Sequence, residues 1–207
     1  MNTQHRKLIE CFAIAALVLA ITSPSATAHD IKRDKGFYLG TSLGGSSLHV
    51  DEDPDAVFQL RDGGGGLTLE AGYSFNRVFS LELVAAGYGF ETTDPTIDAG
   101  VGVFQIFAHY QFRPGHQFRP FVKGGFGGYG LRLEQGSASV SVDGGGLAFG
   151  GGVDYFFTRH FAMGFDLTHN IINYDRLEIG LDGNTAGTEI DEEGAMTTFA
   201  LTFNFYF

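Results

Sequence analysis

The sequence contains a single cysteine, Cys11, which lies in an N-terminal segment built like a secretory signal. Two basic residues precede the apolar run 12–21, and Ala26-Thr27-Ala28 follows it as an A-x-A cleavage site. We therefore predict that residues 1–28 are a signal peptide and that the mature chain begins at His29. Such a mature chain has no disulfide, no thiol nucleophile and no cysteine-bound metal.

Positive charge is also scarce. The predicted mature chain keeps 11 of the 13 basic residues and 23 of the 24 acidic residues. Nucleic-acid binding depends on neutralising phosphates with Lys and Arg, so this balance argues against nucleic acid as a partner.

No segment is long enough and apolar enough for a membrane-spanning helix. The apolar part of the predicted signal holds about ten residues, well below the roughly 20 that a spanning helix needs. Any insertion of the mature chain into a membrane would therefore have to use β-strands.

The last nine residues carry the strongest structural signal in the chain. Apolar side chains occupy every odd position from Phe199 to Phe207, while Ala200, Thr202, Asn204 and Tyr206 lie between them. Side chains alternate between the two faces of a strand, so one face is greasy and the other is largely polar. This pattern is typical of a transmembrane barrel strand, in which lipid covers the apolar face.

Similar segments recur along the whole chain after residue 35. They predict strands near 36–48, 65–75, 78–90, 99–112, 120–133, 145–157, 161–174 and 195–207. Short connections at 76–77, 113–119 and 158–160 alternate with longer ones at 49–64, 91–98, 134–144 and 175–194. We predict an all-β fold over 36–207, an eight-stranded antiparallel transmembrane β-barrel with up-and-down meander order. Residues 29–35 would form a short periplasmic segment before it.

Most predicted strands place a polar stripe on one face. In a barrel of eight strands the side chains just fill the interior. We therefore expect the inward polar residues to form a packed hydrogen-bonded network: Glu70, Glu82, His109, Lys123, Asp154 and Asp166. The segment 120–133 does not keep one parity, and a bulge or glycine kink near Gly127-Gly128 would restore it.

Charge divides between the two kinds of connection. The short ones carry Arg77, Arg113, Arg119 and Arg159 without an acid, whereas acidic residues crowd the long ones. Two acidic stretches, beginning at Asp51 and Asp182, partly follow the spacing of calcium loops but lack the turn glycine or a ligand. Solvated acidic loops are one interpretation, and weak binding of divalent cations that also bridge lipopolysaccharide phosphates is the other.

The chain resembles the small eight-stranded outer-membrane barrels: the OmpA transmembrane domain, the opacity-type surface proteins and OmpW. The matching features are Gly36-Phe37-Tyr38-Leu39-Gly40, Arg119-Pro120-Phe121-Val122-Lys123-Gly124-Gly125 and Asn204-Phe205-Tyr206-Phe207. The resemblance implies export to the outer membrane of a Gram-negative bacterium, where membrane lipids and lipopolysaccharide surround the barrel. It also implies that Phe203, Phe205 and Phe207 form the signal read by the barrel-assembly machinery.

Three classes of function stay open. The leading expectation is a monomeric, non-catalytic protein with a structural or surface-interaction role through its acidic extracellular loops. The second is a narrow channel for small or apolar solutes, as the OmpW resemblance implies.

The third is an acyl hydrolase acting on lipid A, for which His169 would be the membrane-facing base. The His-x-Ser spacing of the lipid A deacylase barrels fails here, because Ile171 stands at the serine position. The G-x-G-x-x-G pattern at 125–130 lies within a predicted strand of an exported chain, so we expect no nucleotide cofactor.

Overall fold

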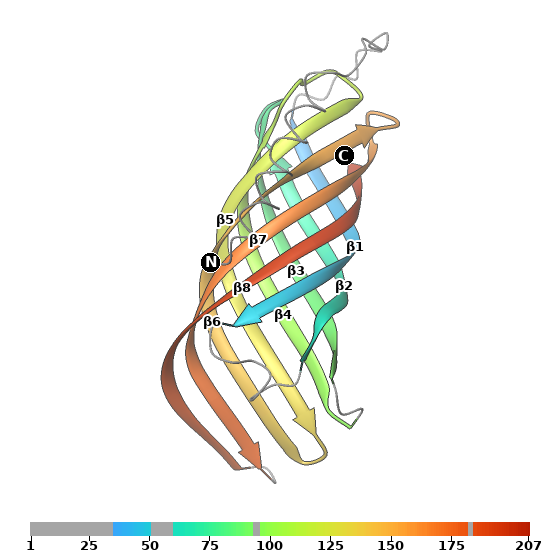
Figure 1. Cartoon of the computed structure of the whole chain (residues 1–207). Coiled ribbons are helices and arrows are strands. Elements are labelled where there is room, and N and C mark those ends of the chain that lie inside the picture. Colours follow the sequence, from blue (N-terminus) through green and yellow to red (C-terminus); the bar gives the residue numbers. More distant parts are fainter. Residues whose placement is uncertain (1–34, 51–59, 93–95, 182–183) are drawn as a thin grey trace, which may run out of the picture.

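The computed structural model describes residues 35–50, 60–92, 96–181 and 184–207. Eight strands form a closed antiparallel ring in chain order, and β1 pairs with β8 to complete it (Figure 1). Their bounds are β1 Gly36–Val50, β2 Leu60–Ser74, β3 Phe79–Thr92, β4 Asp98–Gln111, β5 Phe118–Gln135, β6 Ala138–Phe156, β7 Phe161–Leu181 and β8 Asn184–Tyr206. Within these residues no helix is long and apolar enough to cross a membrane. The predicted eight-stranded barrel is confirmed.

The strand register fixes the tilt of the barrel. Following paired residues once around the ring from Tyr38 leads back to β1 at Leu48, ten residues further along the same strand. A stagger of this size in eight strands corresponds to a tilt of about 40° from the barrel axis, within the usual range for small membrane barrels. The interior of such a barrel is just wide enough for side chains to fill.

The short connections lie at one end of the barrel, the same end at which β1 begins and β8 ends. In the β2–β3 turn, the Asn76 side chain accepts hydrogen bonds from the amides of Val78 and Phe79, both at 2.9 Å. The Thr158 hydroxyl oxygen accepts two similar bonds in the β6–β7 turn. Short turns and chain termini face the periplasm in outer-membrane barrels, so we name this the periplasmic end.

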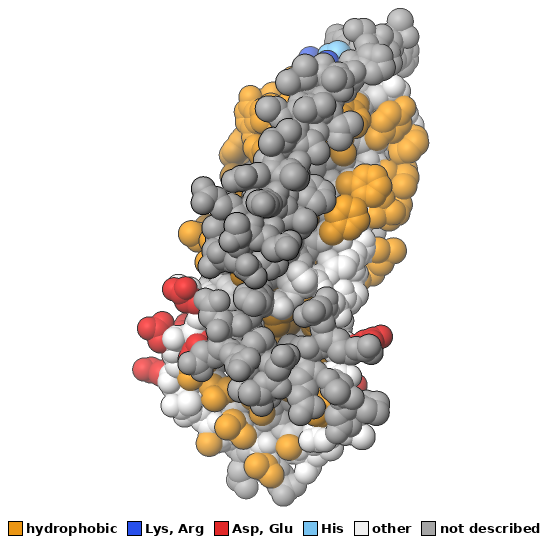
Figure 2. All heavy atoms as spheres, viewed as in Figure 1, with side chains coloured by type: hydrophobic (Ala, Val, Ile, Leu, Met, Phe, Trp, Pro, Cys, Tyr) orange, Lys and Arg blue, Asp and Glu red, His pale blue; other side chains and the backbone are white. Residues whose placement is uncertain are grey.

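The outer surface of the barrel is apolar beside these turns. Aromatic side chains point outward around the periplasmic end and contact one another in pairs, such as Phe37 with Tyr73 at 4.7 Å between ring centroids. This aromatic girdle comprises Phe37, Tyr73, Phe75, Phe79, Tyr110, Phe112, Tyr155, Phe157, Phe161, Phe205 and Phe207. Such girdles mark the membrane–water boundary of transmembrane barrels. Figure 2 shows hydrophobic side chains over the upper part of the view and again near its lower end, with acidic side chains at a height between them.

At the opposite, extracellular end, the strands are longer than the sequence pattern predicted. The predicted long connections at 134–144 and 175–194 are wrong for most of their length, because β5 and β6 run to Gln135 and from Ala138. Likewise β7 ends at Leu181 and β8 begins at Asn184. These four strands extend furthest at the lower end of Figure 1.

The predicted bulge near Gly127-Gly128 is also wrong. The pairing of β5 with β4 and with β6 continues through both glycines without a shift. Parity seemed to fail because both faces of β5 are apolar: Phe126 points to the lipid, whereas Tyr129 and Leu131 point into the barrel. A strand apolar on both faces has no clear alternation in its sequence.

Candidate functional site

The lumen is filled by side chains that change in character from the periplasmic to the extracellular end. β7 shows the order along one strand, since its inward residues run from Ala162 through Asp166, Thr168 and Asn170 to Ile172. The lumen therefore divides into an aromatic cap, an ionic layer, an amide layer and an apolar layer.

The aromatic cap closes the periplasmic mouth. It consists of Tyr38, Phe156, Ala162 and Tyr206, all buried. The Arg119 guanidinium lies over the Phe156 ring at 3.9 Å, and its Nε donates to the carbonyl oxygen of His116 at 2.7 Å. The Tyr38 ring lies where a Cβ on Gly72 would be, so only glycine leaves room for it.

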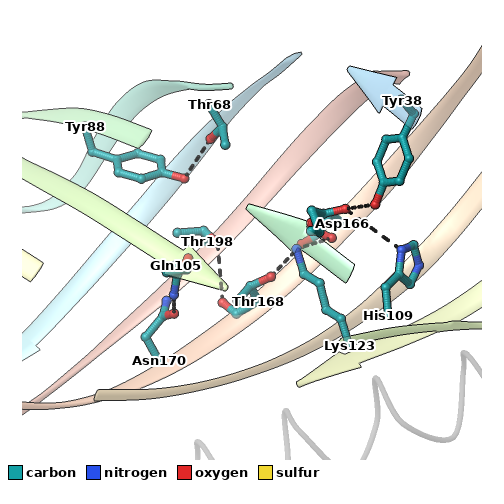
Figure 3. A network of polar contacts seen from close by, with 11 residues as sticks. Tyr38, Thr68, Tyr88, Gln105, His109, Lys123, Asp166, Thr168, Asn170 and Thr198 are labelled. Atoms are coloured by element: carbon teal, nitrogen blue, oxygen red, sulfur yellow. Dashed lines mark hydrogen bonds and ion pairs between the residues drawn. The ribbon is translucent and has the colours of Figure 1, made fainter. Parts of the chain in front are cut away.

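The ionic layer lies on the extracellular side of the cap, and Figure 3 shows its Asp166, Lys123 and His109 near Tyr38. Lys123 Nζ and Asp166 Oδ2 form an ion pair at 2.8 Å, and the Thr168 hydroxyl donates to the other Asp166 oxygen at 2.6 Å. The same ammonium lies 4.5 Å from the centre of the Phe107 ring. Buried ions persist when they are paired and hydrogen-bonded in this way.

A second carboxylate of this layer lies beside the cap. Glu82 Oε2 accepts a hydrogen bond from the Tyr38 hydroxyl at 2.7 Å and lies 3.9 Å from His109 Nδ1. Glu70 reaches into a cavity that Lys123 and Asp166 also line.

The remaining predicted acid of the lumen lies nearer the periplasmic mouth. Asp154 accepts a hydrogen bond from Gln111 Nε2 at 3.0 Å, and Arg119 Nη1 donates to the Gln111 carbonyl at 3.4 Å. The structure thus points all six predicted side chains inward but divides them between two heights. Sequence reasoning missed Arg119, which it placed in a turn although its side chain is 2% exposed and lies at the start of β5.

The amide layer lies on the extracellular side of the ionic layer and is built from three strands. Gln105 Nε2 donates to Asn170 Oδ1 and to the Tyr129 hydroxyl, both at 2.7 Å. Tyr129 in turn donates to Asn170 Oδ1 at 3.0 Å, and the Asn170 amide donates to the Met196 carbonyl oxygen. These mutual contacts satisfy groups that would otherwise be costly to bury.

The extracellular half of the lumen is an apolar layer that the sequence did not predict. It comprises Tyr88, Phe90, Ala99, Val101, Val103, Tyr129, Leu131, Val142, Ile172, Tyr174 and Met196. The polar residues that predicted the lumen side of each strand stop on the periplasmic side of this layer. The one signal of this layer in the sequence is the broken parity of the segment 120–133, for which a bulge or glycine kink is the wrong explanation.

Two small cavities lie in the described part of the lumen. One of about 30 Å³ lies between the ionic and amide layers, and one of about 20 Å³ lies at the periplasmic mouth. A water molecule needs roughly 10–15 Å³ by this kind of measure, so each cavity has room for very few waters.

At the extracellular end, the four long strands continue as a projecting sheet, whose base, Leu131 and Val142, belongs to the apolar layer. We define it as residues 131–135 of β5, 138–143 of β6, 175–181 of β7 and 184–193 of β8. Its charged side chains point away from the barrel axis for the most part, as the paired residues Arg176 and Glu189 do. The acids of this sheet are strand residues, so the predicted acidic loop at 175–194 is largely a rigid surface.

His169 faces outward on β7, as its parity predicted. Its Nδ1 lies 2.9 Å from the Thr197 hydroxyl on β8, and its ring lies 5.2 Å from that of Phe149. Among the described ion pairs, none joins a carboxylate to this histidine. Within the described residues, His169 therefore has a neighbouring hydroxyl that the sequence spacing missed, but it has no ion pair with an acid that would orient the ring.

Other predicted residues lie at the barrel ends. Phe203, Phe205 and Phe207 all face outward at the closing end of β8, and Phe207 N donates to the Phe37 carbonyl oxygen at 3.0 Å. The acidic stretch at 51–55, Asp182 and the predicted signal peptide 1–28 lie outside the described residues. Divalent-cation binding by these stretches stays a prediction.

Comparison with known proteins agrees with this architecture. Neisserial surface protein A has 14% sequence identity and a TM-score of 0.59, over 84% of this chain and 100% of its own. OprG from Pseudomonas aeruginosa has 16% identity and a TM-score of 0.56, over 86% of this chain and 98% of its own. At such identities the likeness shows the fold alone, and no curated protein sequence matches the chain. The family described as the outer membrane protein beta-barrel domain matches residues 13–207, so the chain belongs to this family of bacterial outer-membrane barrels.

Proposed function

We propose that this outer-membrane barrel is a closed, non-catalytic scaffold that presents the projecting sheet to partners outside the cell. The observation that carries this proposal is the contrast between a filled lumen and four strands continued well beyond it. A transmembrane strand needs about 9–11 residues, whereas β7 has 21 and β8 has 23. The extra length is not needed to cross the membrane, and its four strands pair with one another beyond the barrel rim.

Shortening the projecting sheet tests the surface role. Residues 133–140 and 177–188 would each be replaced by a two-residue turn that joins register partners, Arg132 to Ser141 and Arg176 to Glu189. We expect the shortened barrel to assemble, as seen by heat-modifiable migration on gels, and the cells to lose binding to an array of extracellular proteins and glycans. An unchanged binding profile would contradict the surface role.

Conductance in planar bilayers tests closure. Because side chains fill the described lumen around cavities of about 20 and 30 Å³, we expect no current steps from the purified barrel. Reproducible steps would favour the alternative role, a narrow pathway for small or apolar solutes. A large open porin in the same bilayers provides the positive control.

We also propose that the barrel is a monomer in contact with membrane lipids and lipopolysaccharide, and that its last strand is the assembly signal. The outward girdle supports the lipid contact, and the outward-facing Phe203, Phe205 and Phe207 support the signal. Removing Phe207 should lower the fraction of heat-modifiable, inserted barrel in cells, whereas Phe112→Leu in the same girdle should not. Equal insertion of both variants would count against the signal.

A further inference from the structure

The projecting sheet has one apolar face, which lies over the extracellular mouth. We call it the concave face because it continues the inner surface of the barrel. It carries Leu133, Ala138, Val140, Val142, Leu177, Ile179, Leu181, Ala186 and Ile190, with the polar Gln135, Thr188 and Glu192 among them. Ile179 is 45% exposed and Leu181 57% exposed, and the described strands contact mainly their neighbours in the ring. Apolar surface left open to water in this way is typical of interaction sites.

A bulge in β7 places Leu177, Ile179 and Leu181 on the concave face. Gly144 of β6 pairs with Tyr174 and Asp143 pairs with Arg176, so Asp175 is an extra residue without a partner on β6. Without the bulge, strict alternation would turn Leu177 and the apolar residues after it away from the barrel axis. The extra residue thus keeps the lumen side apolar beyond the rim.

The concave face is continuous with the packed interior. Leu133, Leu177 and Ile190 are partly buried and pack against the apolar layer, while Ile179 and Leu181 extend this surface outward. An occupant of the face would therefore rest on a rigid floor, the top of the apolar layer. Pre-formed sites of this kind lose little conformational freedom on binding.

The excess of acids in the projecting sheet favours an occupant with positive charge. The described residues of the projecting sheet include two arginines, Arg132 and Arg176, and eight acids: Glu134, Asp143, Asp175, Glu178, Glu189, Asp191, Glu192 and Glu193. Because the sheet is a single layer, these carboxylates act on an occupant at distances comparable with the Debye length of about 8–10 Å. Such a field attracts cations and repels acidic segments or anionic glycans.

We propose that the concave face binds a cationic amphipathic polypeptide segment, whose apolar side chains cover Ile179 and Leu181 while its Lys or Arg side chains are attracted by the eight acids of the projecting sheet. This inference rests on the proposed surface role and names the chemistry of the partner. A second copy of the chain does not fit this description, because its projecting sheet would bring the same excess of acids.

A synthetic peptide tests the proposal without knowledge of the natural partner. The probe is an 18-residue amphipathic helix of leucine and lysine with one tryptophan, titrated onto the barrel in phosphatidylcholine nanodiscs, with empty discs as the blank. The chain contains no tryptophan, so the emission reports the peptide alone. We expect saturable binding that weakens with salt, and none with the matched leucine–glutamate peptide. Equal binding of both peptides would overturn the proposal.

Two variants separate the concave face from the outer face. Ile179→Ser with Leu181→Ser should weaken peptide binding at least about tenfold, because two apolar contacts are lost. The control, Ser139→Ala with Ser141→Ala, lies on the outer face of the same sheet and should bind as the natural chain does. Unchanged binding by the concave variant would overturn the proposal. Loss of cell-surface binding in the shortened sheet, with retention in the concave variant, would leave the surface role standing and remove only this inference.

Cysteine labelling checks that the face is open before any peptide is added. On intact cells, Ile179→Cys and Ser139→Cys should both react with a membrane-impermeant maleimide, and the peptide should protect only the first. Protection of Ile179→Cys without peptide would show that the face is already covered and would overturn the proposal.

Discussion

The two halves of the lumen fill the same cylinder with opposite chemistry. In the periplasmic half, Lys123, Asp166 and Glu82 depend on specific partners within hydrogen-bonding reach. In the extracellular half, residues such as Leu131 and Ile172 depend only on close packing. A buried ion pair requires its two partners to stay in contact, because breaking it is costly. An apolar layer accepts different hydrophobic side chains of similar volume, and it can continue beyond the membrane. The ionic half thus suits a fixed base and the apolar half suits a surface that extends outward.

Removing the lysine of the ionic layer should produce the largest effect. Lys123→Met leaves Asp166 buried with its partner gone, so we expect the free energy of unfolding to fall by about 3–5 kcal/mol. Urea unfolding in detergent or lipid, followed by tyrosine fluorescence, measures it. Localisation to the outer membrane should be unchanged.

The matched control removes both charges together. Lys123→Met with Asp166→Asn no longer leaves the Asp166 carboxylate buried without its partner, so most of the stability lost with that pair should return. A single variant with the same unfolding midpoint as the natural chain would show that the ion pair contributes nothing. The two halves would then not differ in the way described.

A truncation in the apolar layer should cost somewhat less. Leu131 is 2% exposed, and Leu131→Ala should lower the free energy of unfolding by about 2–4 kcal/mol through lost burial and the cavity left behind. Leu147→Ala is the control, since its side chain faces lipid that can fill the space. If the two leucines cost the same, the extracellular lumen would not be packed like a protein core.

The sequence predicted those parts of the fold in which one face meets lipid and the other meets polar groups. β2 and β3 alternate in this way, so residues such as Leu69 and Glu70 were assigned to the correct faces. The short turns were located because residues such as Asn76 break the pattern and bond to the backbone that follows.

The rest failed where that contrast disappears. In the apolar layer both faces favour apolar side chains, so Tyr129 and Leu131 could not be told from lipid-facing residues. Beyond the membrane the outer face becomes charged, and the strand around Glu178 resembled an acidic loop. The bulge at Asp175 was invisible, because one extra residue shows only in the pairing with neighbouring strands.

Deleting Asp175 should change stability little. It tests whether the pairing of β7 with β6 keeps Ile179 on the concave face. Without the extra residue, β7 can pair with β6 in a regular ladder that keeps Val140 opposite Ile179. We expect the free energy of unfolding to change by less than about 1 kcal/mol, because the bulge lies in an exposed part of the strand. A cysteine pair at Val140 and Ile179 should still form a disulfide in the deletion variant. A matched pair at Val140 and Gly180, on opposite faces, should form none.

A comparably small effect on stability, and none on lipid A, is expected on the outer surface, where His169 meets Thr197. A base that activates a hydroxyl for acyl transfer needs a partner that holds its ring, and His169 has an aromatic neighbour in Phe149 in place of a carboxylate. We therefore expect His169→Gln and Thr197→Val to leave the mass spectrum of lipid A unchanged and to cost about 0.5–1.5 kcal/mol of stability for the lost hydrogen bond. An acyl chain removed only when both natural residues are present would make this pair catalytic. The functional surface would then face the lipid, and the filled lumen would serve as the rigid support that holds two neighbouring strands in register.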